Sequence, residues 1–294
     1  MRVSAGLEDK RSMFRRIVTS VVGLPFLGLF LINGGLALRL ALIFVAALGM
    51  YEFYRVFIGS YRAWTNVHGL VLAAIFAAMY FAELPDLYGA SGMLTSLALL
   101  IMVCCILAVV FHESITVPDI VFRGTSGIVN AAITLVSFFY IAYMLGFVSL
   151  VREAPGGVYL VWLIFISAWG TDTCAYFTGR TMGRRLLCPH LSPSKTVEGA
   201  VGGVVGASAL AMLYGLAISH FFQYTVYTEI LTFGLFSAAA AVLSIFGDLT
   251  ASAIKRHAGV KDFGSIFPGH GGVLDRFDSV LFTAPTIYIM MNFI

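Results

Sequence analysis

Long unbroken runs of apolar residues alternate with short polar breaks along this chain. Each run is close to the ~20 residues that a helix needs to cross the hydrocarbon core of a bilayer. The runs span residues 17–33, 36–57, 67–84, 92–111, 127–150, 157–178, 198–220, 228–254 and 273–293. Breaks rich in Pro, Gly, Asn and Asp separate them. The pattern predicts about nine transmembrane helices joined by short loops.

Composition supports this interpretation. Of the 294 residues, 60% are hydrophobic and 11% are charged, and the mean hydropathy is +0.93. A soluble domain is nearer half apolar and a quarter charged. These values exclude a soluble globular enzyme, a disordered protein and a collagen-like rod, and unbroken apolar runs exclude an alternating β-barrel. The four cysteines show no metal-ligand spacing. We therefore expect an all-α, polytopic helical membrane protein.

The basic residues orient the predicted helices. Nine helices place the termini on opposite faces, and with a cytoplasmic N-terminus only Arg39 and Arg152 of the 18 basic residues lie outside. The positive-inside rule therefore predicts a cytoplasmic N-terminus. The first run follows Arg11, Arg15 and Arg16 and could pass for a signal peptide. Because no convincing small-residue cleavage site follows it, we expect it to remain as the first helix.

Acidic residues concentrate in the second half of the chain. Those on or near the predicted cytoplasmic face are Asp172, Glu198, Asp248, Asp262, Asp275 and Asp278. We therefore predict a transmembrane scaffold of about five helices over residues 1–150. A catalytic transmembrane domain of about four helices is predicted over residues 151–294. Glu52, near the end of the second run, is interpreted as structural.

The stretch from Ser252 to Asp278 combines three features that suit a phosphate site. Asp248, Ser252 and Lys255 are spaced to share one helix face, as are Asp275 and Asp278. A glycine-rich loop precedes the last helix, and its backbone N–H groups could approach an anion. The loop residues are Gly269, His270, Gly271 and Gly272, and the nearby cations are Lys255, Arg256, Lys261 and Arg276. Together they predict a site for Mg²⁺ and a polyphosphate.

Two carboxylates are predicted to lie deeper in the membrane than residues of a surface loop would. Asp248 precedes Lys255 by seven residues, which is about 10 Å along a helix. An ionised carboxylate at that depth costs several kcal/mol unless it is paired or metal-bound. Asp172 lies eight residues before Arg180 at a similar depth. We favour a site shared with Asp248, and the alternative is a structural helix–helix hydrogen bond.

The segment Ser192–Gly199 opens the seventh apolar run. Ser194 or Thr196 could cap that helix, and Lys195 could hold a phosphate. The glycine spacing does not fit a P-loop and we expect no strand before it, so we reject that motif. The glycines that follow are predicted to serve helix packing rather than dinucleotide binding: Gly199, Gly202, Gly203 and Gly206. Arg184 and Arg185 could bind phosphate or only anchor this face.

The residues 252–278 read S-x-x-K-R-x-x-x-x-K-D, then P-G-H-G-G, then D-R-x-D. This run resembles the signature of phosphatidate cytidylyltransferases (CDP-diacylglycerol synthases) without a gap. The resemblance implies transfer of the cytidylyl group of CTP to phosphatidic acid, giving CDP-diacylglycerol and pyrophosphate. It also implies Mg²⁺ held by Asp248, Asp275 and Asp278, K⁺ as a second cation, a homodimer, no nucleic-acid partner and a place in the bacterial cytoplasmic membrane. Asp172 is added as a fourth candidate metal ligand.

Three alternatives remain open. A CTP-dependent lipid kinase, or a cytidylyltransferase for another lipid phosphate, would share the same metal and nucleotide chemistry. A cation-coupled transporter would use Asp172 and Asp248 as ion sites.

For the favoured reaction no general base is needed, because a phosphate monoester with a second pKa of about 6 is already mostly ionised.

Overall fold

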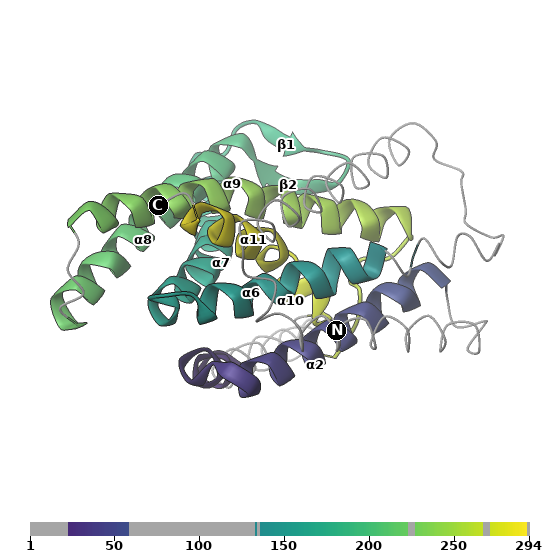
Figure 1. Cartoon of the computed structure of the whole chain (residues 1–294). Helices are drawn as coiled ribbons and strands as arrows, with labels where there is room; N and C mark the ends of the chain where they lie inside the picture. Colours follow the sequence, from purple (N-terminus) through teal and green to yellow (C-terminus); the bar gives the residue numbers. More distant parts are fainter. Residues whose placement is uncertain (1–22, 59–132, 134–135, 223–226, 267–270, 293–294) are drawn as a thin grey trace, which may run out of the picture.

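The structure is a computed structural model that describes residues 23–58, 133, 136–222, 227–266 and 271–292 (Figure 1). A short helix, Gly23–Asn33, precedes α2. The elements that follow are α2 (Gly35–Ile58), the π-helix η2 (Phe138–Tyr143), α6 (Met144–Glu153), α7 (Gly157–Met182), β1 (Leu186–Cys188), β2 (Ser192–Thr196), α8 (Val197–Phe222), α9 (Tyr227–His257), α10 (Leu274–Phe277) and α11 (Val280–Met291).

Four of the predicted apolar runs are long helices whose length and composition suit a membrane span. They are Gly35–Phe57, Gly157–Met182, Val197–Phe221 and Ile230–His257. These helices confirm a mostly helical chain of the kind found in membranes. The runs 67–84 and 92–111 lie outside the described residues, so the total of nine stays a prediction. The last run, 273–293, is divided into α10 and α11.

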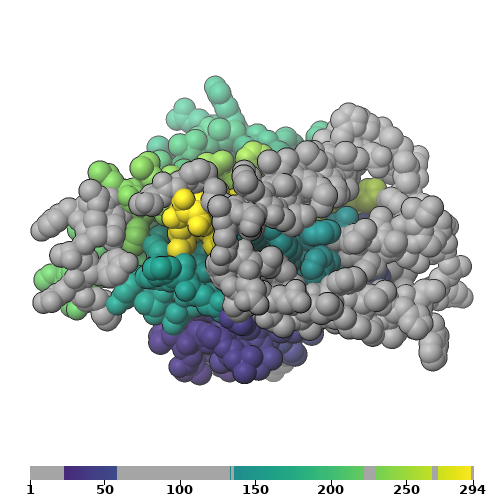
Figure 2. All heavy atoms as spheres, in the orientation of Figure 1, coloured from purple at the N-terminus to yellow at the C-terminus, as the bar shows by residue number. Residues whose placement is uncertain are grey.

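Helix α11 lies among the other C-terminal helices and contacts α6, α7 and α9. Helices α7, α8 and α9 also pack against one another, whereas α2 lies on the other side of the molecule and contacts η2, α6 and α10 (Figure 1). In the space-filling view the purple surface of residues 23–58 borders the teal surface of the helices packed on it (Figure 2). The core between them includes Phe53, Tyr140 and Phe147, which are almost completely buried.

Small residues bring α7 and α8 close together. A Cβ added at Gly203 would lie 2.9 Å from the backbone oxygen of Thr171, and one at Gly202 or Gly206 would collide with Thr178 or Cys174. These positions have no room for a larger side chain. The contacts confirm the prediction that the α8 glycines serve helix packing.

A two-stranded antiparallel hairpin corrects two expectations from the sequence. Strands β1 and β2 pair between α7 and α8, with Leu186 opposite Thr196. The fold is therefore not purely α-helical, and a strand does precede α8, so only the glycine spacing argues against a P-loop. β1 has only three residues and β2 is almost entirely polar, so neither strand shows an alternating apolar pattern. The Thr196 hydroxyl accepts a hydrogen bond from the Gly199 N–H, which confirms one of the two predicted caps.

The two basic residues predicted to lie outside both serve helix contacts at one end of the bundle. Arg39 of α2 forms an ion pair with Glu153 of α6 at 2.6 Å. Arg152 donates hydrogen bonds to the backbone oxygens of Leu31 and Ile32, at 2.5 and 2.6 Å. These carbonyls end the short helix Gly23–Asn33, so the guanidinium satisfies groups that a helix end leaves unpaired.

Candidate active site

The candidate site has two groups of charged residues, and Lys195 is the central cation of the first group. It is carried by β2, forms an ion pair with Asp248 of α9, and interacts electrostatically with Asp172 of α7. Three separate elements therefore contribute here, and Asp172 and Asp248 both interact with one cation, which agrees with their similar predicted depth. Burial lowers the pKa of the Lys195 ammonium below its usual range, and the charges of Asp172 and Asp278 oppose that shift.

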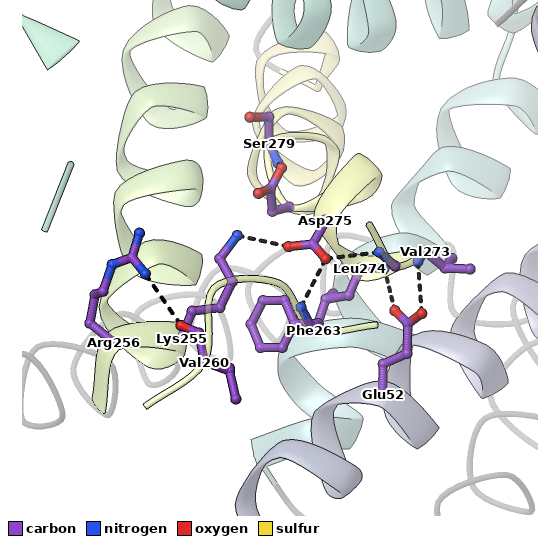
Figure 3. A network of polar contacts seen from close by, with 11 residues as sticks. Glu52, Lys255, Arg256, Val260, Phe263, Val273, Leu274, Asp275 and Ser279 are labelled. Atoms are coloured by element: carbon purple, nitrogen blue, oxygen red, sulfur yellow. Dashed lines mark hydrogen bonds and ion pairs between the residues drawn. The ribbon is translucent and has the colours of Figure 1, made fainter. Parts of the chain in front are cut away.

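Asp275 organises the second group of charged residues (Figure 3). One oxygen, Oδ1, accepts a hydrogen bond from the Lys255 ammonium at 2.8 Å. The other, Oδ2, accepts the N–H groups of Phe263 and Gly272, both at 2.9 Å. Asp275 is 8% exposed, so these contacts satisfy a charge that would be costly to bury alone. They tie the end of α9, the loop after it and α10 to one carboxylate.

Phe263 connects this carboxylate to α2. The Lys255 ammonium lies 5.3 Å from the centre of the Phe263 ring, which is within the range of a cation–π contact. The ring also stacks on Phe53 of α2, with centroids 6.3 Å apart. Because Phe263 is buried and its own N–H binds Asp275, the position of Lys255 depends on packing as well as on charge.

Glu52 of α2 reaches the same loop from the other side. Its carboxylate accepts hydrogen bonds from the N–H groups of Val273 at 3.0 Å and Leu274 at 2.9 Å (Figure 3). It is 2% exposed. Gly264 and Gly272 pack directly on this carboxylate, and a Cβ on either residue would collide with it. The backbone N–H groups beside the glycine-rich loop therefore do bind an anion here. That anion is the Glu52 carboxylate of the protein itself.

Asp278 lies beside Asp275 but has a different set of contacts. Its Oδ1 accepts the N–H of Ser279 at 2.8 Å, and it interacts electrostatically with Lys255 and Asp172. The buried hydroxyl of Tyr140 interacts electrostatically with both Asp275 and Asp278. Within the described residues, three buried hydroxyl groups have no hydrogen-bond partner: those of Tyr140, Ser244 and Ser279.

The other predicted site residues make fewer contacts with this cluster or lie outside the described part. Arg276 is exposed but interacts electrostatically with Asp172. The Arg256 guanidinium donates to the Val260 carbonyl at 3.3 Å, and Lys261 is exposed on the following loop. Ser194 is exposed on β2, and Ser252 lies on α9 between Asp248 and Lys255. Gly269 and His270 lie outside the described residues, whereas Gly271 has a positive φ of 83° and packs on Asp275.

The carboxylates of the site differ in how well they suit a divalent cation. Among the described residues, no three acidic, histidine or cysteine side chains converge to hold a metal by themselves. A carboxylate offers about four lone-pair sites, and Asp275 already uses three of them. Mg²⁺, however, needs only one or two protein carboxylates when it also binds water and phosphate oxygens. Asp172, Asp248 and Asp278 fit that requirement better than Asp275.

Sequence reasoning missed Glu52 and Phe263 as members of this cluster. Glu52 does carry a signal, since an acidic residue within an apolar run is expensive unless it has partners. Its partners lie more than 200 residues away in the chain, so spacing alone cannot reveal them. Phe263 carries no such signal, because an aromatic residue in a loop of a hydrophobic protein is unremarkable.

Long apolar helices around a cluster of carboxylates and cations define a helical membrane protein with a charged candidate site. Comparison with known proteins then identifies the family: this chain belongs to the Cytidylyltransferase family, whose model matches residues 14–294. It is 39% identical over 157 residues to a phosphatidate cytidylyltransferase of Thermotoga maritima and 44% identical over 135 residues to one of Bacillus subtilis.

These two matches span only part of each protein. They cover 53% and 46% of this chain, and 57% and 48% of the relatives, so about half of each relative is matched. A phosphatidate cytidylyltransferase of Staphylococcus aureus (strain COL) is 31% identical over 279 residues, covering 94% of this chain and 98% of that relative. The likeness to this third protein therefore includes the N-terminal half.

Proposed function

We propose that this protein transfers the cytidylyl group of CTP to phosphatidic acid, giving CDP-diacylglycerol and pyrophosphate for phospholipid biosynthesis. The observation that carries the proposal is the ion pair of Lys195 with Asp248 of α9, together with its electrostatic interaction with Asp172 of α7. Membership of the Cytidylyltransferase family and the names of the three relatives support the same reaction.

The residues of this chain account for the main difficulty of the reaction, which is to bring one phosphate anion against another. Lys195, Lys255 and Arg276 supply positive charge around the place where the two substrates must meet. Fixed charges of this kind stabilise the charge that develops during phosphoryl-type transfer. The phosphate of phosphatidic acid attacks the α-phosphorus of CTP, and pyrophosphate leaves. No residue has to remove a proton from an already ionised nucleophile.

The proposal includes Mg²⁺, bound by one or two of the carboxylates of Asp172, Asp248 and Asp278 together with phosphate oxygens of the substrates, and K⁺ as a second cation. Mg²⁺ bound there would neutralise phosphate charge and help to align the reacting groups. Asp275 supports this set by fixing Lys255 and the loop at the start of α10. Lys195 forms an ion pair with Asp248, one of these candidate ligands.

The proposal also includes the membrane setting. A site among apolar helices suits one substrate that stays in the bilayer and another that comes from the cytosol. We infer a bacterial cytoplasmic membrane, about nine helices, a cytoplasmic N-terminus and a site that faces the cytoplasm, because nearly all basic residues then lie inside. We also propose that the protein is a homodimer.

Labelled CTP tests the reaction directly. Purified protein is incubated with phosphatidic acid and Mg²⁺, and with CTP labelled at either the α- or the γ-phosphate. We expect the α label in CDP-diacylglycerol and the γ label in pyrophosphate. Transfer of the γ label to lipid would instead indicate a CTP-dependent kinase, and product from a different lipid phosphate alone would identify another cytidylyltransferase. Cation flux in proteoliposomes without CTP would indicate a transporter.

A further inference from the structure

We infer that Glu52 is a positioning residue, which holds the loop and α10 so that Asp275 and Lys255 keep their places in the site. This inference rests on the proposed function and adds a residue from the half of the chain predicted to be only scaffold. Its basis is the contact between one buried carboxylate of α2 and the backbone on both sides of residues 267–270.

The hydrogen bonds of Glu52 fix the backbone immediately before Asp275. Both carboxylate oxygens are used, one by the Val273 N–H and the other by the Leu274 N–H. Asp275 follows directly, and its Oδ2 binds the N–H of Gly272. The carboxylates of Glu52 and Asp275 therefore bind three successive N–H groups. A shift of this backbone would move the oxygen that holds the Lys255 ammonium.

The glycines show that the loop is built around this side chain. A Cβ at Gly264 would lie 2.7 Å from the Glu52 carboxyl carbon, and one at Gly272 would lie 2.5 Å from it. Neither distance leaves room for an ordinary non-bonded contact. Gly264 precedes residues 267–270 and Gly272 follows them, so Glu52 packs against the backbone at a described position on each side and hydrogen-bonds to it on the second.

Loss of the carboxylate should therefore impair catalysis more than it impairs folding. In Glu52→Gln the side-chain volume is kept, but an amide N–H₂ replaces one acceptor and faces a backbone N–H. Displacement of a reacting group by about 1 Å can cost 10²-fold in rate. We expect kcat to fall by roughly tenfold to 10²-fold, with a smaller change in KM for CTP.

Glu153→Gln is the matched control. Glu153 is likewise an acidic residue that joins α2 to another helix, through Arg39, but it is only partly buried and lies at the other end of α2. We expect a lower melting temperature in detergent and an unchanged kcat per folded molecule. If Glu52→Gln behaves in the same way, with lost stability and normal kcat, then Glu52 is merely structural and the inference is wrong.

A double-mutant cycle tests the contact itself. Gly264→Ala should lower kcat/KM strongly in the wild-type chain, because its methyl group collides with the Glu52 carboxylate. In a Glu52→Ala background the same change should cost much less, since the carboxylate has gone. Additive losses would contradict the inferred packing, because residues in contact are expected to be coupled.

Hydrogen exchange separates this inference from the proposed function. Mass spectrometry of peptides covering residues 271–280 should show faster amide exchange in Glu52→Gln than in wild type, and no change in Glu153→Gln. This readout needs no substrate. Wild-type protein that makes no CDP-diacylglycerol would overturn the proposed function, whereas unchanged exchange in Glu52→Gln would overturn the positioning role.

Discussion

The acidic residues of the site differ in how many acceptor positions remain for a ligand. Asp275 is bound by one ammonium and two N–H groups, whereas Asp278 is bound by one N–H and Asp248 by Lys195. Spacing on a helix predicts that Asp275 and Asp278 face the same way, but it cannot count their partners. We therefore propose that Asp275 mainly organises the site and that Asp172, Asp248 and Asp278 are the better candidate ligands for a cation.

Asp275→Asn tests the organising carboxylate. An amide has one acceptor oxygen, so either Lys255 or the N–H groups of Phe263 and Gly272 would face an N–H₂ group. We expect turnover to fall by about 10²-fold or more, the scale of a lost electrostatic stabiliser. Initial rates at limiting Mg²⁺ provide the measurement, with Glu153→Gln again as control. Turnover close to wild type would refute the assignment.

Asp172 and Asp248 should behave as a unit, because both act on Lys195 and would repel each other without a cation between them. We expect Asp172→Asn to weaken the apparent Mg²⁺ affinity and extra Mg²⁺ to restore part of the activity. Asp248→Asn should be more severe, and the double variant far from additive. A Mg²⁺ titration beside a melting curve is the measurement. Lost stability with unchanged cation dependence would show that Asp172 is a structural hydrogen-bonding group.

At the scale of elements, the sequence predicts the long helices well and the connections poorly. The runs 36–57, 157–178, 198–220 and 228–254 agree closely with α2, α7, α8 and α9, because length and hydropathy determine such helices. The hairpin of β1 and β2 was missed, since its pairing depends on backbone hydrogen bonds and not on an apolar pattern. The contact of Glu52 with α10 was missed because it joins distant parts of the chain.

The close packing of α7 on α8 links stability to the site. Gly203 of α8 faces the backbone oxygen of Thr171, the residue before Asp172. In Gly203→Ala the added methyl group should push the helices apart, at a cost of about 1–3 kcal/mol, and move Asp172 away from Lys195. We expect a lower melting temperature together with a lower kcat/KM.

Gly23→Ala is the matched control for this change. A Cβ at Gly23 would meet nothing within 4 Å, so alanine should be neutral or slightly stabilising in that helix. If Gly203→Ala melts and turns over like Gly23→Ala, the two helices do not need a glycine at this contact.

At the scale of the whole molecule, the two ends of α2 have different tasks. Arg39 near its start pairs with Glu153, and Glu52 binds the site loop 13 residues later, about 20 Å along the helix. Arg152 lies at the same end of the bundle as Arg39. It binds the C-terminal end of the short helix Gly23–Asn33, which precedes α2. Both basic residues predicted to lie outside therefore have structural partners, whereas Lys195 and Lys255 lie at the candidate site.

This separation is what the predicted orientation requires. If the end of the bundle that carries Arg39 and Arg152 faces outward, the site cations lie on the cytoplasmic side, where CTP is present. The basic residues on that side also satisfy the positive-inside rule. With about nine helices, we then expect a cytoplasmic N-terminus and an external Ile294. An even number of helices would place both termini on the same face.

Fusions at the C-terminus measure this orientation in cells. Alkaline phosphatase fused after Ile294 should be active, because it folds only outside the cytoplasm, and a fluorescent protein at the same position should stay dark. A fusion to the loop that contains Lys195 should show the reverse pattern and serves as the internal control. An inactive phosphatase with a fluorescent partner at Ile294 would place the C-terminus inside, and the helix number or the orientation would then be wrong. Replacing Arg39 and Arg152 by Gln should lower the melting temperature without changing either signal, because their charges hold helices together and do not orient the chain.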